Sequence, residues 1–437
     1  MTSLNSVYSK LESKNATIGV VGLGYVGLPL INTALSASFS AIGFDIDQKK
    51  VDLLSKGESY IEHVDTSILG SAVNNKNVAF SSSKNEIQQC DVIVLCLPTP
   101  LNKHREPDLS YVVSSLQEML PFMRPGQLLV LESTTYPGTT EEKLLPIIEK
   151  ANFQIGDNFF LAYSPEREDP GNKSYSVNGI PKVVSGITQN CLSLAELFYS
   201  QIGCQTVPVS STKVAEMTKI LENTYRSVNI ALVNELKVLA DLMDIDIFEV
   251  IEAASTKPFG YQAFYPGPGL GGHCIPIDPF YLTWKAREYN FHTRFIELAG
   301  EINTAMPDYV ISKIQSGLNQ LSKSTNDAKI LVIGVAYKKN VGDVRESPGI
   351  EIIDKLTKLG AKVLYHDPYV GQIPNMRKYD LKMTSVELTK DTIKNCDICV
   401  LITDHDNLDY DLINCAELIV DTRGKISSNN TANVIKA

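Results

Sequence analysis

The stretch TIGVVGLGYVGLPL, residues 17–30, decides the fold of the N-terminal part of the chain. Its apolar residues 18–21 predict a buried strand, and Gly22, Gly24 and Gly27 follow as G-x-G-x-x-G. The residues after Gly27 have a helical pattern. A strand, a glycine turn and a helix in this order are typical of a dinucleotide-binding unit.

The residues of this turn have separate physical roles. Gly22 allows the tight turn, Gly24 lets a pyrophosphate approach the backbone, and Gly27 lets helix and strand pack closely. Tyr25 and Val26 lie at the start of the helix, whose N-terminus faces the phosphates. We therefore expect these five residues to bind a cofactor.

Asp45 ends the next predicted strand, 21 residues past Gly24. A carboxylate at this place accepts hydrogen bonds from the adenosine ribose hydroxyls, and it would repel a 2′-phosphate. The sequence therefore predicts NAD as the cofactor, in preference to NADP.

Working outward, apolar strands alternate with helical segments in two separate regions of the chain. The first region continues with CDVIVLCLPTP (90–100) and QLLVLESTTYPGTT (127–140), and the second contains AKILVIGVAYKK (328–339) and CDICVLITDHD (396–406). Strands without polar alternation belong to parallel sheets covered on both faces. We therefore expect an α/β protein with two doubly wound, Rossmann-like domains, residues 1–205 and 325–437.

The segment between these domains has a different texture. Residues 211–243 have helical periodicity without glycine or proline, which corresponds to a helix of roughly 45 Å. A helix of this length often spans two domains or packs against its copy in a dimer, although a helix in the core of a middle domain is the plainer interpretation. We predict a helical central domain at 206–324, carrying a substrate loop and mediating a homodimer or higher homo-oligomer.

Composition limits the class of partner. The 437 residues carry a formal net charge of −10, which disfavours nucleic acids and anionic membrane surfaces. Without a long apolar run or a signal-peptide pattern, we expect a cytoplasmic protein. Cys396 and Cys399 form a CxxC within a predicted strand, where they would point to opposite faces, so we expect no metal site.

Cys274 lies in GPGLGGHCIPIDP (267–279), a stretch too rich in glycine and proline for a helix or strand. Its thiol could be a buried spacer, a metal ligand, half of a disulfide or a nucleophile. As a nucleophile, a thiolate adds to an aldehyde; hydride loss then gives a thioester, and water releases an acid. Asp278, four residues later, could assist proton transfer.

Two further groups can serve such chemistry. Lys219 and Asn223 share one face of the predicted long helix, where a cation and an amide can stabilise an oxyanion. From this pair alone, an exposed lysine beside a surface asparagine is the plainer interpretation. Glu166 in YSPEREDPG (163–171) could activate a hydrolytic water, but charged loops are usually only solvated.

The second domain starts differently from the first. Its first turn, GVAYKKNVGDVRES (334–347), lacks the glycine pattern and carries Lys338, Lys339 and Arg345. We interpret it as a nucleotide fold that holds the nucleotide attached to the substrate; a solvated basic turn is the alternative.

Several motifs together resemble one family, the nucleotide-sugar 6-dehydrogenases that act on UDP-glucose and UDP-N-acetylhexosamines. The motifs are GLGYVGLPL, ESTTYPGTT, YSPERE, KILENTYR, GGHCIPIDP and KKNVGDVRESPG, and they extend over nearly the whole chain. The GGHCIP and SPEREDPG versions are most similar to UDP-N-acetylglucosamine 6-dehydrogenases of surface-polysaccharide pathways.

The resemblance implies a role for each matching residue, with Cys274 as the nucleophile. The implied catalytic residues are Thr134, Glu166, Lys219, Asn223, Cys274 and Asp278, with Thr135 possible in place of Thr134. The implied cofactor residues are those of the glycine turn, Asp45, Lys50, Thr99, Thr134 and Arg345. The implied substrate residues are Glu166, Arg167, Lys219, Asn223, Tyr265, Gly271 and Lys338.

The activity expected from this resemblance is an NAD-dependent four-electron oxidation of the C6 hydroxyl of UDP-N-acetylglucosamine, giving the uronic acid for polysaccharide biosynthesis. UDP-N-acetylmannosamine and UDP-glucose are the alternative substrates. Two other classes stay open: a simple two-electron alcohol dehydrogenase with a structural Cys274, and an NAD-binding redox sensor without turnover.

Overall fold

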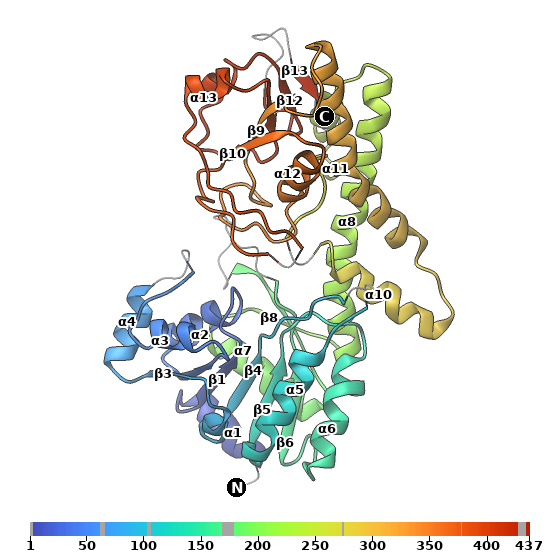
Figure 1. Ribbon diagram of the computed structural model, residues 1–437. Helices are drawn as coiled ribbons and strands as arrows, with labels where there is room; N and C mark the ends of the chain where they lie inside the picture. Colours follow the sequence, from blue (N-terminus) through green and yellow to red (C-terminus); the bar gives the residue numbers. More distant parts are fainter. Residues whose placement is uncertain are drawn as a thin grey trace. The chain divides into compact units, whose positions relative to one another are not determined.

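The computed structural model describes residues 3–61, 66–102, 106–167, 179–272, 275–376, 378–426 and 434–437 (Figure 1). The chain divides into two compact units, Met1–Glu222 with Trp284–Phe291 and Asn223–Thr283 with His292–Ala437. We call them the first and the second unit. The division into domains 1–205, 206–324 and 325–437 remains a prediction, since the two units divide the chain within its long helix.

The first unit contains an eight-stranded sheet in the order β3-β2-β1-β4-β5-β6-β7-β8. All neighbouring strands are parallel except β6 and β7. The strands are β1 (Thr17–Val21), β2 (Ser40–Phe44), β3 (Val78–Ser81), β4 (Val92–Leu95), β5 (Gln127–Leu131), β6 (Phe159–Tyr163), β7 (Lys182–Gly186) and β8 (Thr206–Pro208).

The central strands of this sheet are buried on both faces, which explains why they lack polar alternation. In β4, Val92 and Val94 join one apolar cluster, whereas Ile93 and Leu95 join another. The helices of the first unit are α1 (Ser3–Glu12), α2 (Gly27–Ser36), α3 (Gln48–Leu54), α4 (Thr66–Asn74), α5 (Ser110–Met119), α6 (Leu145–Lys150) and α7 (Gln189–Gln201).

The second unit contains a five-stranded, fully parallel sheet in the order β10-β9-β11-β12-β13. Its strands are β9 (Lys329–Ile333), β10 (Lys362–His366), β11 (Ile398–Leu401), β12 (Ile419–Asp421) and β13 (Val434–Lys436). The helices whose residues all belong to this unit are α9 (Ile247–Ser255), α11 (Arg294–Gln320), α12 (Pro348–Lys358), α13 (Lys390–Lys394) and α14 (Tyr410–Ile413).

The long helix α8 runs from Thr212 to Leu242, within one residue of each predicted end. It begins in the first unit and ends in the second. Helix α10 (Asp278–Ala286) also belongs to both units, but it begins in the second and ends in the first. The predicted α/β class, with two doubly wound sheets and a long central helix, is confirmed.

The structure also departs from the sequence-based expectations. It adds strands that the apolar pattern did not reveal, among them the antiparallel β7. Cys396 precedes β11, and it joins the same apolar cluster as Cys399, so the expectation that the two thiols point to opposite faces was wrong. Within the described ranges, the structure has no cluster of three or more His, Cys, Asp or Glu side chains that could hold a metal ion.

Among the helices of the described ranges, none combines the length and the apolar character needed to cross a bilayer.

Candidate active site

The glycine turn after β1 has the geometry of a phosphate cradle. Gly22 has φ +95°, and a Cβ there would lie 2.4 Å from the carbonyl oxygen of Cys96. A Cβ on Gly27 would lie 1.9 Å from the carbonyl oxygen of Gly22, whereas the space around Gly24 is open to 4 Å. Only glycine fits at the first and third positions, and the second leaves the backbone open to a ligand, so the turn fits a dinucleotide.

Asp45, at the end of β2, lies beside this turn. Its Oδ2 accepts a hydrogen bond from the backbone N–H of Leu23 (3.1 Å) and lies 3.4 Å from Nζ of Lys50. Tyr60, which sequence reasoning missed, donates its hydroxyl to the carbonyl of Leu23, and Nζ of Lys50 lies 5.4 Å from its ring. Burial, followed by the charges of Asp45 and Asp47, raises the pKa of Tyr60, so the hydroxyl keeps its proton. The glycine turn and the residues expected to bind the ribose, Asp45 and Lys50, are therefore connected by hydrogen bonds and an ion pair.

Two predicted threonines meet where β4 and β5 end. The hydroxyl of Thr99 donates to the backbone carbonyl of Thr134 over 2.7 Å. Thr134 is half-buried, whereas Thr135 is fully buried. Of the two threonines that the sequence left open, Thr134 is therefore the one whose surface a ligand can reach.

The loop after Thr134 is anchored to α8 by Glu216. This buried carboxylate accepts hydrogen bonds from the N–H of Gly138 (2.5 Å) and from the N–H and hydroxyl of Thr140 (2.9 and 2.7 Å). Burial raises the pKa of Glu216 to about 7, against the effect of these hydrogen bonds. Tyr136 in the same loop packs on Trp284, with ring centroids 5.0 Å apart.

Glu166 and Arg167 follow β6 in the first unit. Oε1 of Glu166 accepts from the backbone N–H of Arg167 over 2.6 Å. The guanidinium of Arg167 is engaged twice, with Glu222 of α8 (2.6 Å) and with the carbonyl of Pro181 (2.6 Å). Arg167 therefore ties the loop after β6 to α8.

Lys219 lies on α8 with only 8% of its surface exposed. In the part of the chain that the structure describes, it forms no ion pair. The interpretation of Lys219 as an ordinary surface lysine is therefore wrong: its side chain is buried.

Asn223 lies one turn further along α8. Its Nδ2 donates to Oδ2 of Asp278 over 2.6 Å, and the two residues are 3% and 2% exposed. Asp278 is the first residue of α10. Sequence reasoning gave each of these residues a role but did not foresee that they bond to each other.

Cys274, together with His273, lies outside the described residues. The loop before them is held by side chains of the second unit. The N–H of Gly267 donates to Oδ1 of Asn234 (2.9 Å), whose Nδ2 donates to Asn303 (2.9 Å). These buried asparagines also escaped sequence reasoning, because their partners lie far away in the chain.

Gly271 lies against the first turn of the second domain. A Cβ on Gly271 would lie 2.6 Å from Cβ of Tyr337, the neighbour of Lys338. The N–H of Gly272 donates to the carbonyl of Arg345 over 2.9 Å. The loop that carries Gly271 thus contacts the turn that carries Lys338 and Arg345.

Two predicted ligand side chains, those of Arg345 and Tyr265, are open to solvent. The guanidinium of Arg345 pairs with Asp343 (2.7 Å) and is 48% exposed. Tyr265 is 52% exposed. Both belong to the second unit, whereas the glycine turn and Asp45 belong to the first.

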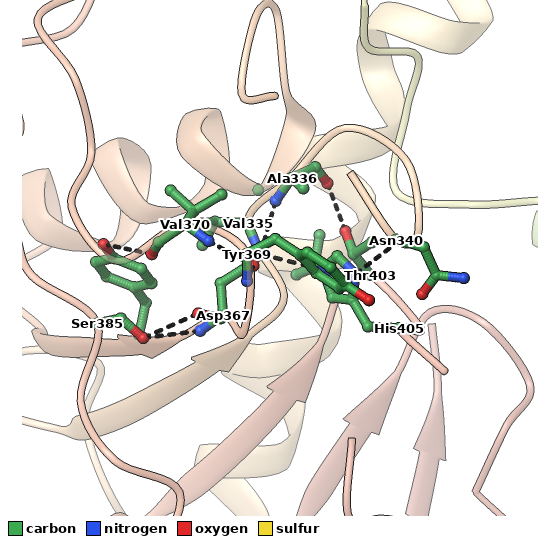
Figure 2. A network of polar contacts seen from close by, with 12 residues as sticks. Val335, Ala336, Asn340, Asp367, Tyr369, Val370, Ser385, Thr403 and His405 are labelled. Atoms are coloured by element: carbon green, nitrogen blue, oxygen red, sulfur yellow. Dashed lines mark hydrogen bonds and ion pairs between the residues drawn. The ribbon is translucent and has the colours of Figure 1, made fainter. Parts of the chain in front are cut away.

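The second domain also has a carboxylate after its second strand, but it is used differently. Figure 2 shows Asp367, after β10, surrounded by donors. Its Oδ2 accepts from the N–H groups of Val335 (2.6 Å) and Ala336 (3.0 Å), and Nε2 of His405 lies 3.2 Å away. Nδ1 of His405 accepts from the N–H of Asn340 over 2.9 Å. Asp367 therefore holds the turn that carries Lys338.

Sequence models of one family match three parts of the chain. They describe the UDP-glucose/GDP-mannose dehydrogenase family: its NAD binding domain matches residues 16–203, its central domain 213–305, and its UDP binding domain 331–428. These matches agree with the resemblance drawn from the motifs.

Individual relatives carry different substrate names. The chain is 36% identical to the UDP-N-acetyl-D-glucosamine 6-dehydrogenase of Pseudomonas aeruginosa, over 84% of this chain and 86% of that protein. It is 32% identical to the UDP-N-acetyl-D-mannosamine dehydrogenase of Methanococcus vannielii, over 96% and 95%. Among solved structures, a UDP-D-ManNAc dehydrogenase from Pyrococcus horikoshii has a TM-score of 0.83 at 28% identity, covering 94% of this chain and 96% of that one.

Proposed function

Because the chain belongs to the UDP-glucose/GDP-mannose dehydrogenase family, we propose that it oxidises the C6 hydroxyl of UDP-N-acetylglucosamine to the uronic acid. The observation that carries this proposal is the buried bond between Asn223 and Asp278, one helical turn from the buried Lys219. A carboxylate, an amide and a cation kept away from water suit a reaction in which an alkoxide and a tetrahedral carbon develop charge.

NAD is the cofactor of this oxidoreductase, and when bound it would supply the hydride acceptor for each proposed oxidation. We propose that the glycine turn, Asp45 and Lys50 bind the adenosine half, with Thr99, Thr134 and Arg345 as further contacts. The open space at Gly24 and the position of Asp45 beside the turn support this assignment.

Our assignment of the chemistry centres on Cys274. The first oxidation converts the C6 alcohol to an aldehyde, and the thiolate of Cys274 adds to its carbonyl carbon. Loss of a second hydride leaves a thioester, which water cleaves to the acid and the thiol. In total, one sugar, one water and two NAD⁺ yield one carboxylate, two NADH and three protons.

The remaining catalytic residues act on charges and protons in this scheme. Lys219 and Asn223 stabilise the oxyanion on C6, and Asp278, held in place by its hydrogen bond from Asn223, itself accepts or returns a proton. Glu166 activates the water that cleaves the thioester, while Thr134 positions a water or the cofactor. Arg167, Tyr265, Gly271 and Lys338 complete the proposed substrate contacts.

The choice of sugar rests on the GGHCIP and SPEREDPG motifs and on the 36% identical relative. UDP-N-acetylmannosamine is the second candidate, favoured by the name of the relative that matches over 96% of this chain. UDP-glucose is the third. We further propose that the product feeds polysaccharide biosynthesis and that the enzyme works in the cytoplasm, where the thiol of Cys274 stays reduced.

We also propose a homodimer or a higher homo-oligomer. Leu232, Leu236 and Leu239 lie at helical spacing on α8 and are 40–52% exposed. An apolar stripe of this kind on a long helix suits packing against a second copy. Light scattering of the wild type and of a Leu236→Lys variant tests this, with a smaller particle expected for the variant.

The test of the proposed reaction is the amount of NADH released per molecule of limiting sugar. About two NADH per UDP-N-acetylglucosamine, and little from the other two sugars, is the expected result. About one NADH would favour the two-electron dehydrogenase with a structural Cys274. NAD binding without turnover on any of the three sugars would favour the redox sensor. In the proposed mechanism, Cys274→Ala forms no acid.

A further inference from the structure

A buried ionic cluster lies behind Glu166 in the first unit. Nζ of Lys182 lies 3.0 Å from Oε1 of Glu132 and 3.3 Å from Oε2 of Glu166. The side chain of Glu132 is fully buried, that of Lys182 is 11% exposed and that of Glu166 is 18% exposed. Lys182 therefore forms ion pairs with two carboxylates, and Glu166 is the more exposed of the two.

The topology of the sheet brings these residues together. Glu132 directly follows β5, and Glu166 comes three residues after the end of the neighbouring strand β6. Lys182 is the first residue of β7, which is antiparallel to β6 and pairs Tyr163 with Ser185. Because β7 runs in the opposite direction, its beginning lies beside the end of β6. If β7 were parallel to β6, its first residue, Lys182, would lie beside the beginning of β6, at the opposite ends of the strands.

The inner end of the cluster is fixed. The hydroxyl of Tyr199 on α7 donates to Oε1 of Glu132 over 2.5 Å, and Nζ of Lys182 lies 5.0 Å from the centre of the Tyr199 ring. Burial raises the pKa of Glu132. Burial opposes the charge on Lys182 as well, but the two carboxylates outweigh it and raise the pKa of Lys182. Lys182 therefore stays an ammonium.

We propose that Lys182 is a positioning residue for hydrolysis of the acyl intermediate: it holds Glu166 as an oriented carboxylate, while Glu132 anchors Lys182 from inside. This inference rests on the proposed function. Without Glu132, the flexible lysine side chain could turn toward solvent; with it, Lys182 is restrained between two acceptors. The N–H of Arg167 fixes the other oxygen of Glu166, so the carboxylate is held at both ends.

The assisted step balances as follows. The water oxygen adds to the thioester carbon as one water proton passes to Glu166. The C–S bond then breaks, and sulfur leaves with the electron pair as a thiolate. Glu166 returns its proton to the thiolate, and the new carboxylic acid releases one proton to solvent. Lys182 neither gains nor loses a proton in this sequence.

The test separates hydrolysis from the two oxidations. We expect Lys182→Met, given excess NAD and UDP-N-acetylglucosamine, to release a normal burst of two NADH per chain and then to turn over at least tenfold more slowly. Acid-quenched protein should carry the mass of the bound acyl group, and hydroxylamine should remove it. Lys182→Arg should restore most of the steady-state rate, since it keeps the charge and the hydrogen bonds.

Two further variants complete the experiment: one replaces Lys182→Met if that protein does not fold, and the other is a matched control. If Lys182→Met does not fold because Glu132 is left unpaired, the double variant Lys182→Met/Glu132→Gln removes both inner charges and should show the same burst and acyl mass. Lys84→Met is the matched control: Lys84 is in the same unit, its side chain is 12% exposed, and it pairs with Glu118. Its burst and steady-state rates should equal those of the wild type.

The outcomes are distinguishable. An unchanged steady-state rate in Lys182→Met, or an equal loss in burst and steady state without an acyl mass, overturns the role of Lys182. If Glu166→Gln accumulates the acyl species while the Lys182 variants do not, the proposed function stands and this inference alone fails. If the wild type releases only one NADH per sugar, both fail together.

Discussion

Asn223 on α8 donates a 2.6 Å hydrogen bond to Asp278, and both side chains are buried. The bond fixes the amide so that its carbonyl oxygen faces away from the carboxylate. It also orients the carboxylate of Asp278 through its Oδ2. This pair joins two segments that are 55 residues apart in the chain.

Asp278→Asn tests the charge of this pair with little change in shape. The variant can still accept a hydrogen bond from Asn223, but it cannot serve as a base at neutral pH. We expect kcat to fall by about 10²–10⁴, the usual range for loss of an acid–base group, with little change in NAD affinity. Steady-state NADH formation measures this. Asp308→Asn, an exposed change in the same unit, is the control, and a wild-type kcat for Asp278→Asn would contradict the role.

Asp45→Ala tests the proposal that Asp45 binds the adenosine ribose of NAD. Removing the carboxylate deletes the acceptor beside the glycine turn, so NAD should bind about tenfold more weakly, or ~1.4 kcal/mol. The chain has one tryptophan, Trp284, which packs on Tyr136 in the first unit, and its quenching by bound cofactor reports the affinity. Asp52→Ala, an exposed position on α3, should bind NAD normally. Equal affinity in both variants would refute the assignment of Asp45.

Asn234→Ala tests the support of the substrate loop. The change removes the acceptor for the N–H of Gly267 and the donor to Asn303. Leaving these buried groups unpaired should lower the free energy of unfolding by about 1–3 kcal/mol. It should also raise the KM for the sugar more than that for NAD. Denaturant unfolding and initial rates measure the two effects. Asn319→Ala, exposed on α11, should change neither quantity, and a fully stable Asn234→Ala would show that the loop does not need this anchor.

Lys237→Met tests a buried amine on α8. Lys237 is 3% exposed, and its Nζ has no hydrogen-bond partner within the described ranges. Burial, helped by the charge of Arg423 and opposed by Asp421 and Asp241, lowers its pKa to about 7 from 10.5. Between these two pH values the unfolded chain binds more protons than the folded one, so the wild type gains stability as pH rises, by up to about 1.4 kcal/mol per pH unit.

The measurement is the difference in unfolding free energy between Lys237→Met and the wild type from pH 6 to 10. The variant should be the more stable at pH 6, and its advantage should shrink steadily above pH 7. Lys362→Met changes a lysine whose side chain is 64% exposed, and its difference from the wild type should be flat. A flat difference for Lys237→Met would mean that the amine is not desolvated.

The sequence was most informative where the local pattern dictates the structure. The glycine turn could be predicted because strand, glycines and helix are contiguous, and α8 because 31 residues without glycine or proline repeat one period. The burial of Lys219 could not be predicted, because helical spacing gives a common face but not what covers it. Nor could the choice between Thr134 and Thr135, which depends on which of them lies under other chain segments.

The least predictable features are contacts between distant segments. Glu132 and Lys182 are 50 residues apart in the chain, and they meet only because β7 is antiparallel to β6. A lysine at the start of a strand gives no sign of this. Tyr60 and the Asn234–Asn303 pair escaped for the same reason, since each bonds to a partner set by tertiary packing.

The acceptor capacity of two carboxylates distinguishes the two Rossmann-like halves. Each half has an aspartate after its second strand, but Asp367 receives five donors, and its side chain has no exposed surface. Asp45 receives three from the described residues, and 9% of its side chain is exposed. A carboxylate has about four lone-pair directions. Asp367 is therefore saturated by its own chain, whereas Asp45 can still accept a hydroxyl. Strand order alone would predict a ribose site in both halves, whereas the remaining acceptor capacity favours the proposed site at Asp45 and disfavours one at Asp367.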